Sequence, residues 1–457
     1  MPVTQHPSSY RDPSGFIFLH NGQHYRQVNN FFKNDFDLFI NSGCYDSLVK
    51  DGSLIPHKEI NENLTGSPDH YKTLLPESVQ FISYPYEWSF DMLKDAALLT
   101  LQLVKESVKF GLILKDATPY NIQWHNGKLV FIDTLSFAKY NEQEPWIAYR
   151  QFCECFLSPL LLMHYSKNQL HQLQLAYPEG IPLAVTKSLL PYKSKFAFHV
   201  YLHIHLHAGI SASNKDASNK TPQFSKQKLL NLISSLETAV SKLKLPDQKT
   251  TWSDYYDEAS QREDYLQPKK GIIQEWVSKL QHLNTAIDLG ANDGEFSKML
   301  SQKNIYTLAT DFDPLCINNL YKEISKNKIA NIQPLIIDLS NPSPAIGVNN
   351  TERMSFIDRT KVDLAMALAV VHHLAIGKNI PFEKIAELFS AITNHLIIEF
   401  VPKEDEKVQL MLRNKKDIYH NYTEEQFLVA FEKRFTLEEK LPVGNSGRSL
   451  YLMKKHV

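Results

Sequence analysis

Five short apolar runs alternate with longer amphipathic segments in the chain from Gly271 onward. The runs are TAIDLG, IYTLATDF, IQPLIIDL, VDLAMAL and HLIIEFV. Such alternation is typical of parallel strands that are joined by helices. Two later runs, RFTLEEKL and SLYLMKK, are separated by PVGNSGR, which can form a hairpin turn but not a helical crossover. The sequence therefore predicts an α/β fold with a mostly parallel sheet and an antiparallel edge hairpin.

The 457 residues exceed what one hydrophobic core usually organises, so two or three domains are expected. Residues 211–228 are rich in serine, asparagine and lysine and read as a linker. The following run, LLNLISSLETAVSKL, has helical spacing and ends before Pro246. We predict an N-terminal domain over 1–210, a linker with a bridging helix over 211–250, and a second domain over 251–457.

The charge and cysteine content narrow the possible partners. Lysine and arginine number 49 against 50 acidic residues, so the net charge is -1. No global basic field exists to hold nucleic acid or an anionic membrane, although a local patch remains possible. The four cysteines are too scattered for a disulfide framework. The N-terminus lacks the features of a secretory signal, and no apolar run is long enough for a membrane span. We expect a soluble, cytoplasmic protein, with its oligomeric state left open.

A turn with two glycines joins the first predicted strand of the second domain to a helix. In AIDLGANDGEFSKML, Asp288 ends the strand, and Gly290 and Gly294 allow the backbone to approach a ligand closely. Tight turns need glycine even where nothing binds, so this signal is weak alone. The next strand, however, ends in Asp311 and Asp313, where a carboxylate can accept hydrogen bonds from both ribose hydroxyls. Together these features favour a nucleoside-bearing cofactor.

Four segments in order, DLGANDGEF, ATDFDP, LIIDLS and VDLAMALAVVHHL, resemble the motifs of class I S-adenosylmethionine (SAM) dependent methyltransferases. The resemblance covers about 200 residues and implies a Rossmann-like seven-stranded methyltransferase sheet with SAM as cofactor. It also implies roles for seven residues: Asp288, Gly290 and Gly294 against the methionine part of SAM, Asp311 on the ribose, Asp338 on the adenine amino group, and Phe312 and Leu339 on either side of the adenine ring.

Asn292 departs from the common pattern of that family, because it replaces the middle glycine. Asparagine tolerates left-handed backbone angles better than most residues, so the turn can persist. A nicotinamide dinucleotide is the competing ligand for such a sheet. Gly290 and Gly294 are four positions apart without a third glycine, whereas a dinucleotide fingerprint requires G-x-G-x-x-G.

An aromatic segment, TTWSDYYDEASQREDYLQPKK, precedes the first strand of this domain. Trp252, Tyr255, Tyr256 and Tyr265 resemble the segment that closes over the cofactor or acceptor in related methyltransferases. The alternative is that these rings pack in a seam between domains.

Transfer of a methyl group to a hydroxyl requires alignment of the acceptor and a base that removes its proton. His372 and His373 follow the fourth strand, and Glu399 ends the fifth, so all three are candidates. The histidines can equally cap a helix or pack on the sheet, and Glu399 can hold a backbone amide. A second histidine group, His199, His203 and His207, has helical spacing and reads as a polar helix face rather than a metal site.

The segment KDATPYNIQWHNGKLVFIDTLSF in the N-terminal half resembles the catalytic and metal-binding loops of kinase-like and aminoglycoside-phosphotransferase-like folds. Asp116, Asn121 and Asp133 occupy the matching places. No glycine-rich phosphate loop and no convincing strand lysine precede them in FIFLHNGQHYRQVNNFF. The segment can also be an ordinary loop fixed by its own polar side chains. We therefore predict a degenerate kinase-like α+β domain that serves acceptor binding or scaffolding.

The whole layout, with its WSDYY and HHL stretches, also resembles bacterial proteins grouped with host-specific nodulation methyltransferases. That resemblance implies a small-molecule or glycan acceptor and favours O-methylation. Two alternatives remain open: a phosphotransferase regulated by a SAM-binding domain, and a non-catalytic module that retains SAM as a structural ligand.

Overall fold

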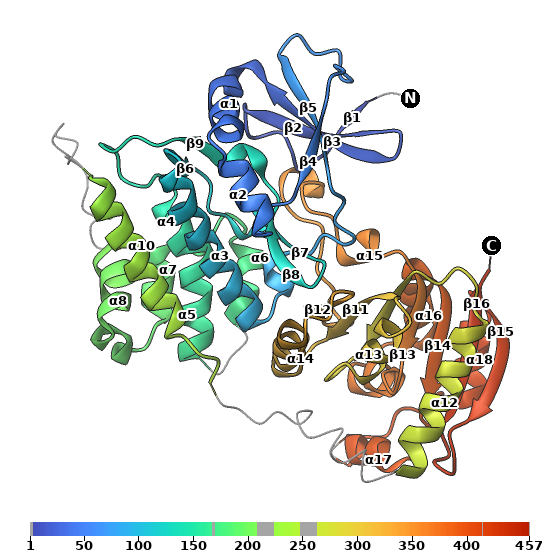
Figure 1. Ribbon diagram of the computed structural model, residues 1–457. Coiled ribbons are helices and arrows are strands. Elements are labelled where there is room, and N and C mark those ends of the chain that lie inside the picture. Colours follow the sequence, from blue (N-terminus) through green and yellow to red (C-terminus); the bar gives the residue numbers. More distant parts are fainter. Residues whose placement is uncertain (1–2, 167–169, 208–223, 247–262, 414, 457) are drawn as a thin grey trace. The chain divides into compact units, whose positions relative to one another are not determined.

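The computed structural model describes residues 3–166, 170–207, 224–246, 263–413 and 415–456. The chain forms two compact units (Figure 1). Unit 1 comprises residues 1–248 together with 346–353, and unit 2 comprises 249–345 and 354–457.

A five-stranded antiparallel sheet begins unit 1, with the strand order β1-β2-β3-β5-β4. The strands are β1 (Thr4–Gln5), β2 (Gly15–His20), β3 (Gln23–Asn29), β4 (His57–Ile60) and β5 (His70–Pro76), and the helices α1 (Lys33–Asn41) and α2 (Cys44–Lys50) lie between β3 and β4. The two helices cover the sheet with apolar side chains such as Phe36, which is buried against Leu74.

The rest of unit 1 is mostly helical. Its longest helix, α3 (Phe90–Lys109), begins after Ser89, whose hydroxyl accepts the amide N–H of Met92, and it buries an apolar face at helical spacing. Two short antiparallel strand pairs follow: β6 (Leu112–Leu114) with β9 (Phe137–Lys139), and, between these two in the chain, the hairpin of β7 (Ile122–His125) and β8 (Lys128–Phe131).

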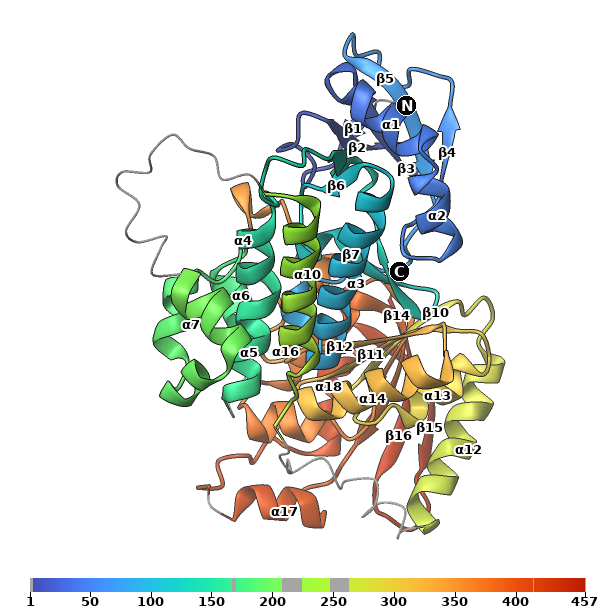
Figure 2. The same cartoon turned by 60° about the vertical axis from the view of Figure 1, so that its left-hand side comes forward.

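The remaining helices of unit 1 are α4 (Tyr149–Phe152), α5 (Ser158–Tyr165), α6 (Leu173–Ala176), α7 (Leu183–Leu189), α8 (Phe198–Val200) and α10 (Lys226–Ser241). Helix α10 is the one predicted over residues 229–243, and it packs beside α3 (Figure 2). Most of the predicted linker, residues 211–223, lies outside the described residues.

Unit 2 contains a seven-stranded sheet with the order β12-β11-β10-β13-β14-β16-β15. The strands are β10 (Thr285–Leu289), β11 (Tyr306–Asp311), β12 (Ile332–Ile336), β13 (Val362–Ala367), β14 (Thr393–Phe400), β15 (Phe435–Pro442) and β16 (Ser449–Lys455). The first five are parallel to one another, whereas β16 runs antiparallel to both β14 and β15. The predicted mostly parallel sheet with an antiparallel edge hairpin is confirmed.

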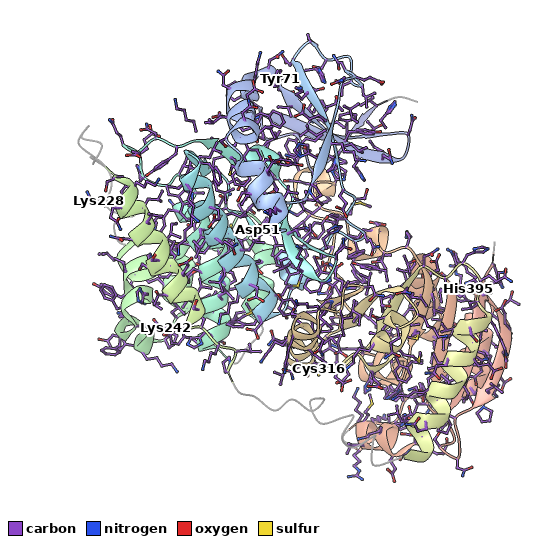
Figure 3. All side chains as sticks on the ribbon, in the orientation of Figure 1. Asp51, Tyr71, Lys228, Lys242, Cys316 and His395 are labelled. Carbon is purple, nitrogen blue, oxygen red and sulfur yellow. The ribbon has the colours of Figure 1, made fainter. Side chains whose placement is uncertain are left out.

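One helix, α12 (Glu263–Lys279), precedes the first strand, and the other helices of unit 2 connect the strands, as the alternation of apolar and amphipathic segments predicts. The others are α13 (Glu295–Ser301), α14 (Pro314–Asn327), α15 (Phe356–Arg359), α16 (Phe382–Ile392), α17 (Glu406–Leu412) and α18 (Glu424–Phe431). Helix α14 packs against β11 and β12, with Cys316 buried on it, and α16 packs against β13 and β14 (Figure 3). The strand order reverses between β10 and β13, and such a switch point is where open α/β sheets bind ligands.

Candidate functional site

A pocket of about 240 Å³ opens in unit 2 at the carboxyl ends of β10, β11 and β13. Eight of the residues predicted for the site line it: Asp288, Gly290, Asn292, Asp311, Phe312, Asp338, Leu339 and His373. They are far apart in the sequence and meet because parallel strands end at the same edge of the sheet. Gly294, His372 and Glu399 lie outside the lining.

The turn that leaves β10 is fixed against the neighbouring strand. The amides of Gly290 and Ala291 both donate to the carbonyl of Thr310 on β11, at 2.8 and 2.9 Å. Gly290 has φ +77°, and a Cβ atom there would lie 2.7 Å from Val370. Asn292 also adopts a left-handed conformation, with φ 52°, which asparagine accepts better than most residues. The turn therefore persists without the missing glycine.

Gly294 serves packing rather than the pocket. It lies at the N-terminus of α13 with φ +78°, and a Cβ atom there would lie 2.7 Å from Leu320 on α14. The resemblance implied a contact with the methionine part of SAM, but the glycine instead allows α13 and α14 to approach closely.

Asp311 faces the turn from the end of β11. Its Oδ2 atom accepts the amide N–H of Asn292 at 2.9 Å, and its Oδ1 atom accepts the amide N–H of Asp313 at 2.9 Å. Burial raises the pKa of Asp311 to about 6, although these bonds oppose the shift. A carboxylate offers about four lone-pair positions, so this one can still accept hydrogen bonds from a ligand in the pocket.

Asp288 lies beneath the turn on β10. Its carboxylate accepts the hydroxyl of Ser297 at 2.7 Å, and burial raises its pKa to about 6. The charge of Lys269 counteracts that rise. Asp288 thus links the strand to α13 from the floor of the pocket.

The other side of the pocket combines apolar and polar groups. Phe312 is half exposed and forms one wall with Leu339. Asp338 is held in place because its Oδ1 atom accepts both the amide and the hydroxyl of Ser340, at 2.8 and 2.6 Å. Lys378 lies 3.8 Å from its other oxygen. A flat apolar ring system with an amino group fits such a wall.

His373, rather than His372, reaches the pocket. The two rings are 4.0 Å apart, but His372 is buried behind the lining, and its Nδ1 atom has no hydrogen-bond partner among the described residues. Burial lowers the pKa of His372 well below its usual value and that of His373 to about 4. Both rings are therefore neutral at pH 7.

Glu399 is fully buried and does not reach the pocket, so it cannot contact an acceptor there. It instead accepts the hydroxyl of Tyr265 at 2.7 Å and the ammonium of Lys269 at 2.6 Å. Arg448 donates to the same hydroxyl at 2.8 Å and to Asp405 at 2.8 Å. The sequence placed Glu399 at the correct edge of the sheet but did not reveal the two cations that cover it.

Lys269 and Tyr265 belong to this buried network and also line the pocket. The Tyr265 hydroxyl donates to Glu399 and accepts from Lys269 and Arg448, so its hydrogen-bonding capacity is filled. An ammonium has three donors, and Lys269 uses two, on Tyr265 at 3.0 Å and on Glu399. Within the described part of the chain its third donor has no partner. Lys269 can therefore donate to an anionic group of a ligand.

The sequence contained one signal for this network. Tyr265 and Lys269 are four positions apart on α12, which places them on one face of the helix. Tyr265 was singled out with Trp252, Tyr255 and Tyr256, but those three lie outside the described residues.

Asp116 and Asn121, two residues of the kinase-like resemblance, are joined by a hydrogen bond in unit 1. Asn121 donates to the Oδ2 atom of Asp116 at 3.1 Å, and Gln151 donates to the Oδ1 atom of Asp116 at 2.7 Å. Burial and the nearby Asp133 raise the pKa of Asp116. Asp133 forms an ion pair with Arg26 on β3, and Ser136 donates to it. Although burial opposes the shift, these groups lower the pKa of Asp133.

The histidine group of unit 1 forms internal hydrogen bonds. His203 is buried, with Nδ1 2.9 Å from the Tyr149 hydroxyl and Nε2 2.9 Å from the Ser235 hydroxyl, and His199 lies 3.1 Å from Ser235. Both ring nitrogens of His203 are thus satisfied by protein groups. This arrangement supports the interpretation as a polar helix face.

Comparison with known proteins yields one curated relative over nearly the whole chain. The chain is 32% identical over 465 residues to the nodulation protein NoeA of Rhizobium meliloti (strain 1021). The aligned region covers 98% of this chain and 95% of NoeA. No family model matches. The predicted resemblance to bacterial nodulation proteins is confirmed.

Solved structures match about half of the chain. The bifunctional kinase-methyltransferase WbdD is 19% identical, with a TM-score of 0.31 over 48% of this chain and 46% of WbdD, so the match spans less than half of that protein. A SAM-dependent methyltransferase from Aquifex aeolicus is also 19% identical, with a TM-score of 0.32 over 46% of this chain and 100% of that chain.

Proposed function

This chain belongs to the family of the nodulation protein NoeA, and we propose that its unit 2 is a class I SAM-dependent methyltransferase. One observation carries the proposal. The Asp311 carboxylate, at the tip of the second strand, accepts a hydrogen bond from the turn that leaves the first strand, and both line an open pocket. A buried carboxylate beside a glycine turn at a sheet switch point is what recognition of a ribose requires.

The residues of the pocket fit SAM in each part of its structure. Asp311 accepts hydrogen bonds from the ribose, while Phe312 and Leu339 hold the adenine ring and Asp338 accepts from its amino group. Lys269 offers its remaining donor to the methionine carboxylate. When bound, SAM supplies a methyl group on a positively charged sulfur.

The acceptor that we propose is a hydroxyl of a small molecule or glycan. The acceptor oxygen forms a bond to the methyl carbon as the bond from that carbon to sulfur breaks, and the hydroxyl proton moves to a base. His373 is our candidate, because it lines the pocket and because burial lowers its pKa to about 4, so that its ring is neutral at pH 7. His372 holds the neighbouring ring in place from behind.

For unit 1 we propose a degenerate kinase-like module that binds or presents the acceptor. The hydrogen bond from Asn121 to Asp116 supports this proposal, and it also keeps a phosphotransferase as the second candidate function. Asp133, which would hold a metal ion in a working enzyme, is instead neutralised by Arg26. If ATP with Mg²⁺ raises the melting temperature of the protein and SAM does not, the phosphotransferase is the better assignment.

A transfer assay with methyl-labelled SAM tests the proposal. We expect label to pass from SAM to at least one member of a panel of hydroxylated small molecules and oligosaccharides, and no label to pass with the Asp311→Ala variant. Asp358→Ala, which alters an exposed carboxylate outside the pocket of the same unit, is the matched control. SAM binding without any transfer would favour the non-catalytic module, and absence of SAM binding would refute the proposal.

A further inference from the structure

Four aromatic rings are exposed within ten residues of unit 1. Tyr192, Phe196, Phe198 and Tyr201 are 71%, 80%, 70% and 46% exposed. They lie on a 3-10 helix (Tyr192–Phe196), on α8 and at the start of a π-helix (Tyr201–Leu206). Single exposed apolar side chains are common on protein surfaces, but groups of them usually mark an interaction site.

The segment that carries the rings is packed, so the exposure is not that of a loose loop. Val200 and Ile204 are buried beneath it, and Ser194 is buried with its hydroxyl 2.9 Å from Nε2 of His205. The rings of Tyr201 and His205 are 6.2 Å apart, and those of Tyr192 and Phe196 are 5.7 Å apart. His205 therefore joins the turn that carries Tyr192 and Phe196 to the turn that carries Tyr201.

The segment that carries the rings contains lysines and no acidic residues. Residues 183–207 contain Lys187, Lys193 and Lys195, all exposed, and neither aspartate nor glutamate. The Lys195 ammonium lies 4.7 Å from the centre of the Tyr192 ring. Burial lowers the pKa of His205, and the charges of Lys195 and Lys187 lower it further, so both lysines lie near this histidine. A local positive field thus exists on a chain whose net charge is -1.

We propose that this aromatic–lysine patch, formed by Tyr192, Phe196, Phe198, Tyr201, Lys187 and Lys195, binds the surface of a membrane that contains anionic lipids. The rings enter the boundary between headgroups and acyl chains, and the lysines bind headgroup phosphates. No helix in the described ranges is long and apolar enough to cross a membrane, so the contact is peripheral.

The composition of the patch favours lipid over other occupants. Protein interfaces are depleted in lysine, whereas membrane-surface segments combine lysine with phenylalanine. Single-stranded nucleic acid is usually held in a basic groove lined by stacking rings. The rings of Phe196 and Phe198 are instead largely exposed and carry no polar group, as insertion into a lipid interface requires.

Co-sedimentation of the full-length protein with vesicles tests this proposal. We expect the wild type to sediment with phosphatidylcholine vesicles that contain phosphatidylglycerol, and not with phosphatidylcholine alone. A lysine near an anionic surface contributes about 1 kcal/mol, so Lys187→Gln with Lys195→Gln should weaken binding roughly 25-fold. Phe196→Ser with Phe198→Ser should weaken it more strongly, because each ring buries a large apolar area.

Matched controls come from unit 1. Phe31 is 76% exposed outside the patch, and two further lysines are exposed, Lys228 on α10 and Lys242 directly after that helix (Figure 3). Phe31→Ser and the double variant Lys228→Gln with Lys242→Gln should bind vesicles as the wild type does, and all variants should keep its melting temperature. Failure of the wild type to bind anionic vesicles would overturn the proposal. The proposal would also be overturned if patch and control variants weakened vesicle binding equally. The same holds if the patch residues were needed for a dimer of the protein and that dimer did not bind vesicles.

Discussion

Replacement of Glu399 by glutamine tests the buried network beside the pocket. The carboxylate is fully buried, accepts from Lys269 at 2.6 Å and from Tyr265 at 2.7 Å, and lies 3.8 Å from Arg448. Glutamine has the same shape but no charge, and its amide group would face two cationic donors. Loss of one member of a buried ion pair costs about 3 to 5 kcal/mol.

For a unit of this size, such a loss lowers the melting temperature by roughly 10 °C. Differential scanning calorimetry of the wild type and Glu399→Gln measures the shift in the transition of unit 2. Glu387→Gln is the control, because Glu387 pairs with Lys384 on the exposed face of α16 and should change the transition little. If Glu399→Gln melts within a degree or so of the wild type, the network does not have the energetic role that we assign to it.

Three further predictions concern ligand binding and unit 1. Lys269→Met should weaken binding of SAM but not of methylthioadenosine, which lacks the carboxylate; equal loss for both ligands in calorimetric titrations would contradict the carboxylate contact. The affinity for SAM should fall as the pH is lowered through about 6, because protonation of Asp311 removes acceptors for the ribose. If the affinity does not change between pH 7 and pH 5, this role of Asp311 is contradicted. Arg26→Met should destabilise unit 1 by less than the roughly 3 kcal/mol of a fully buried pair, since it leaves the largely buried Asp133 without its charged partner. Unchanged denaturant unfolding would contradict this prediction.

The sequence was sufficient to predict the sheet of unit 2, because each parallel strand there is a nearly continuous apolar run bounded by turn residues. The residues at strand ends were predictable for the same reason: Asp288, Asp311 and Asp338 follow buried strands whose carboxyl ends meet at one edge.

Side-chain direction was not predictable. His372 and His373 are adjacent in the sequence, and only packing decides which of them lines the pocket. Arg448 lies in the segment between β15 and β16, about 180 residues from Tyr265, so no local pattern connects them. Arg26 on β3 likewise pairs with Asp133, which lies 107 residues later in the chain, so no local pattern connects them.

Isothermal titration calorimetry with SAM tests the central claim most directly. We predict that the wild type binds one SAM per chain and that Asp311→Ala, which should still unfold in one cooperative transition of unit 2, binds it far more weakly, whereas Asp358→Ala binds as the wild type does. Equal affinity of the wild type and Asp311→Ala for SAM, or no heat of binding with the wild type, would contradict the assignment of this pocket.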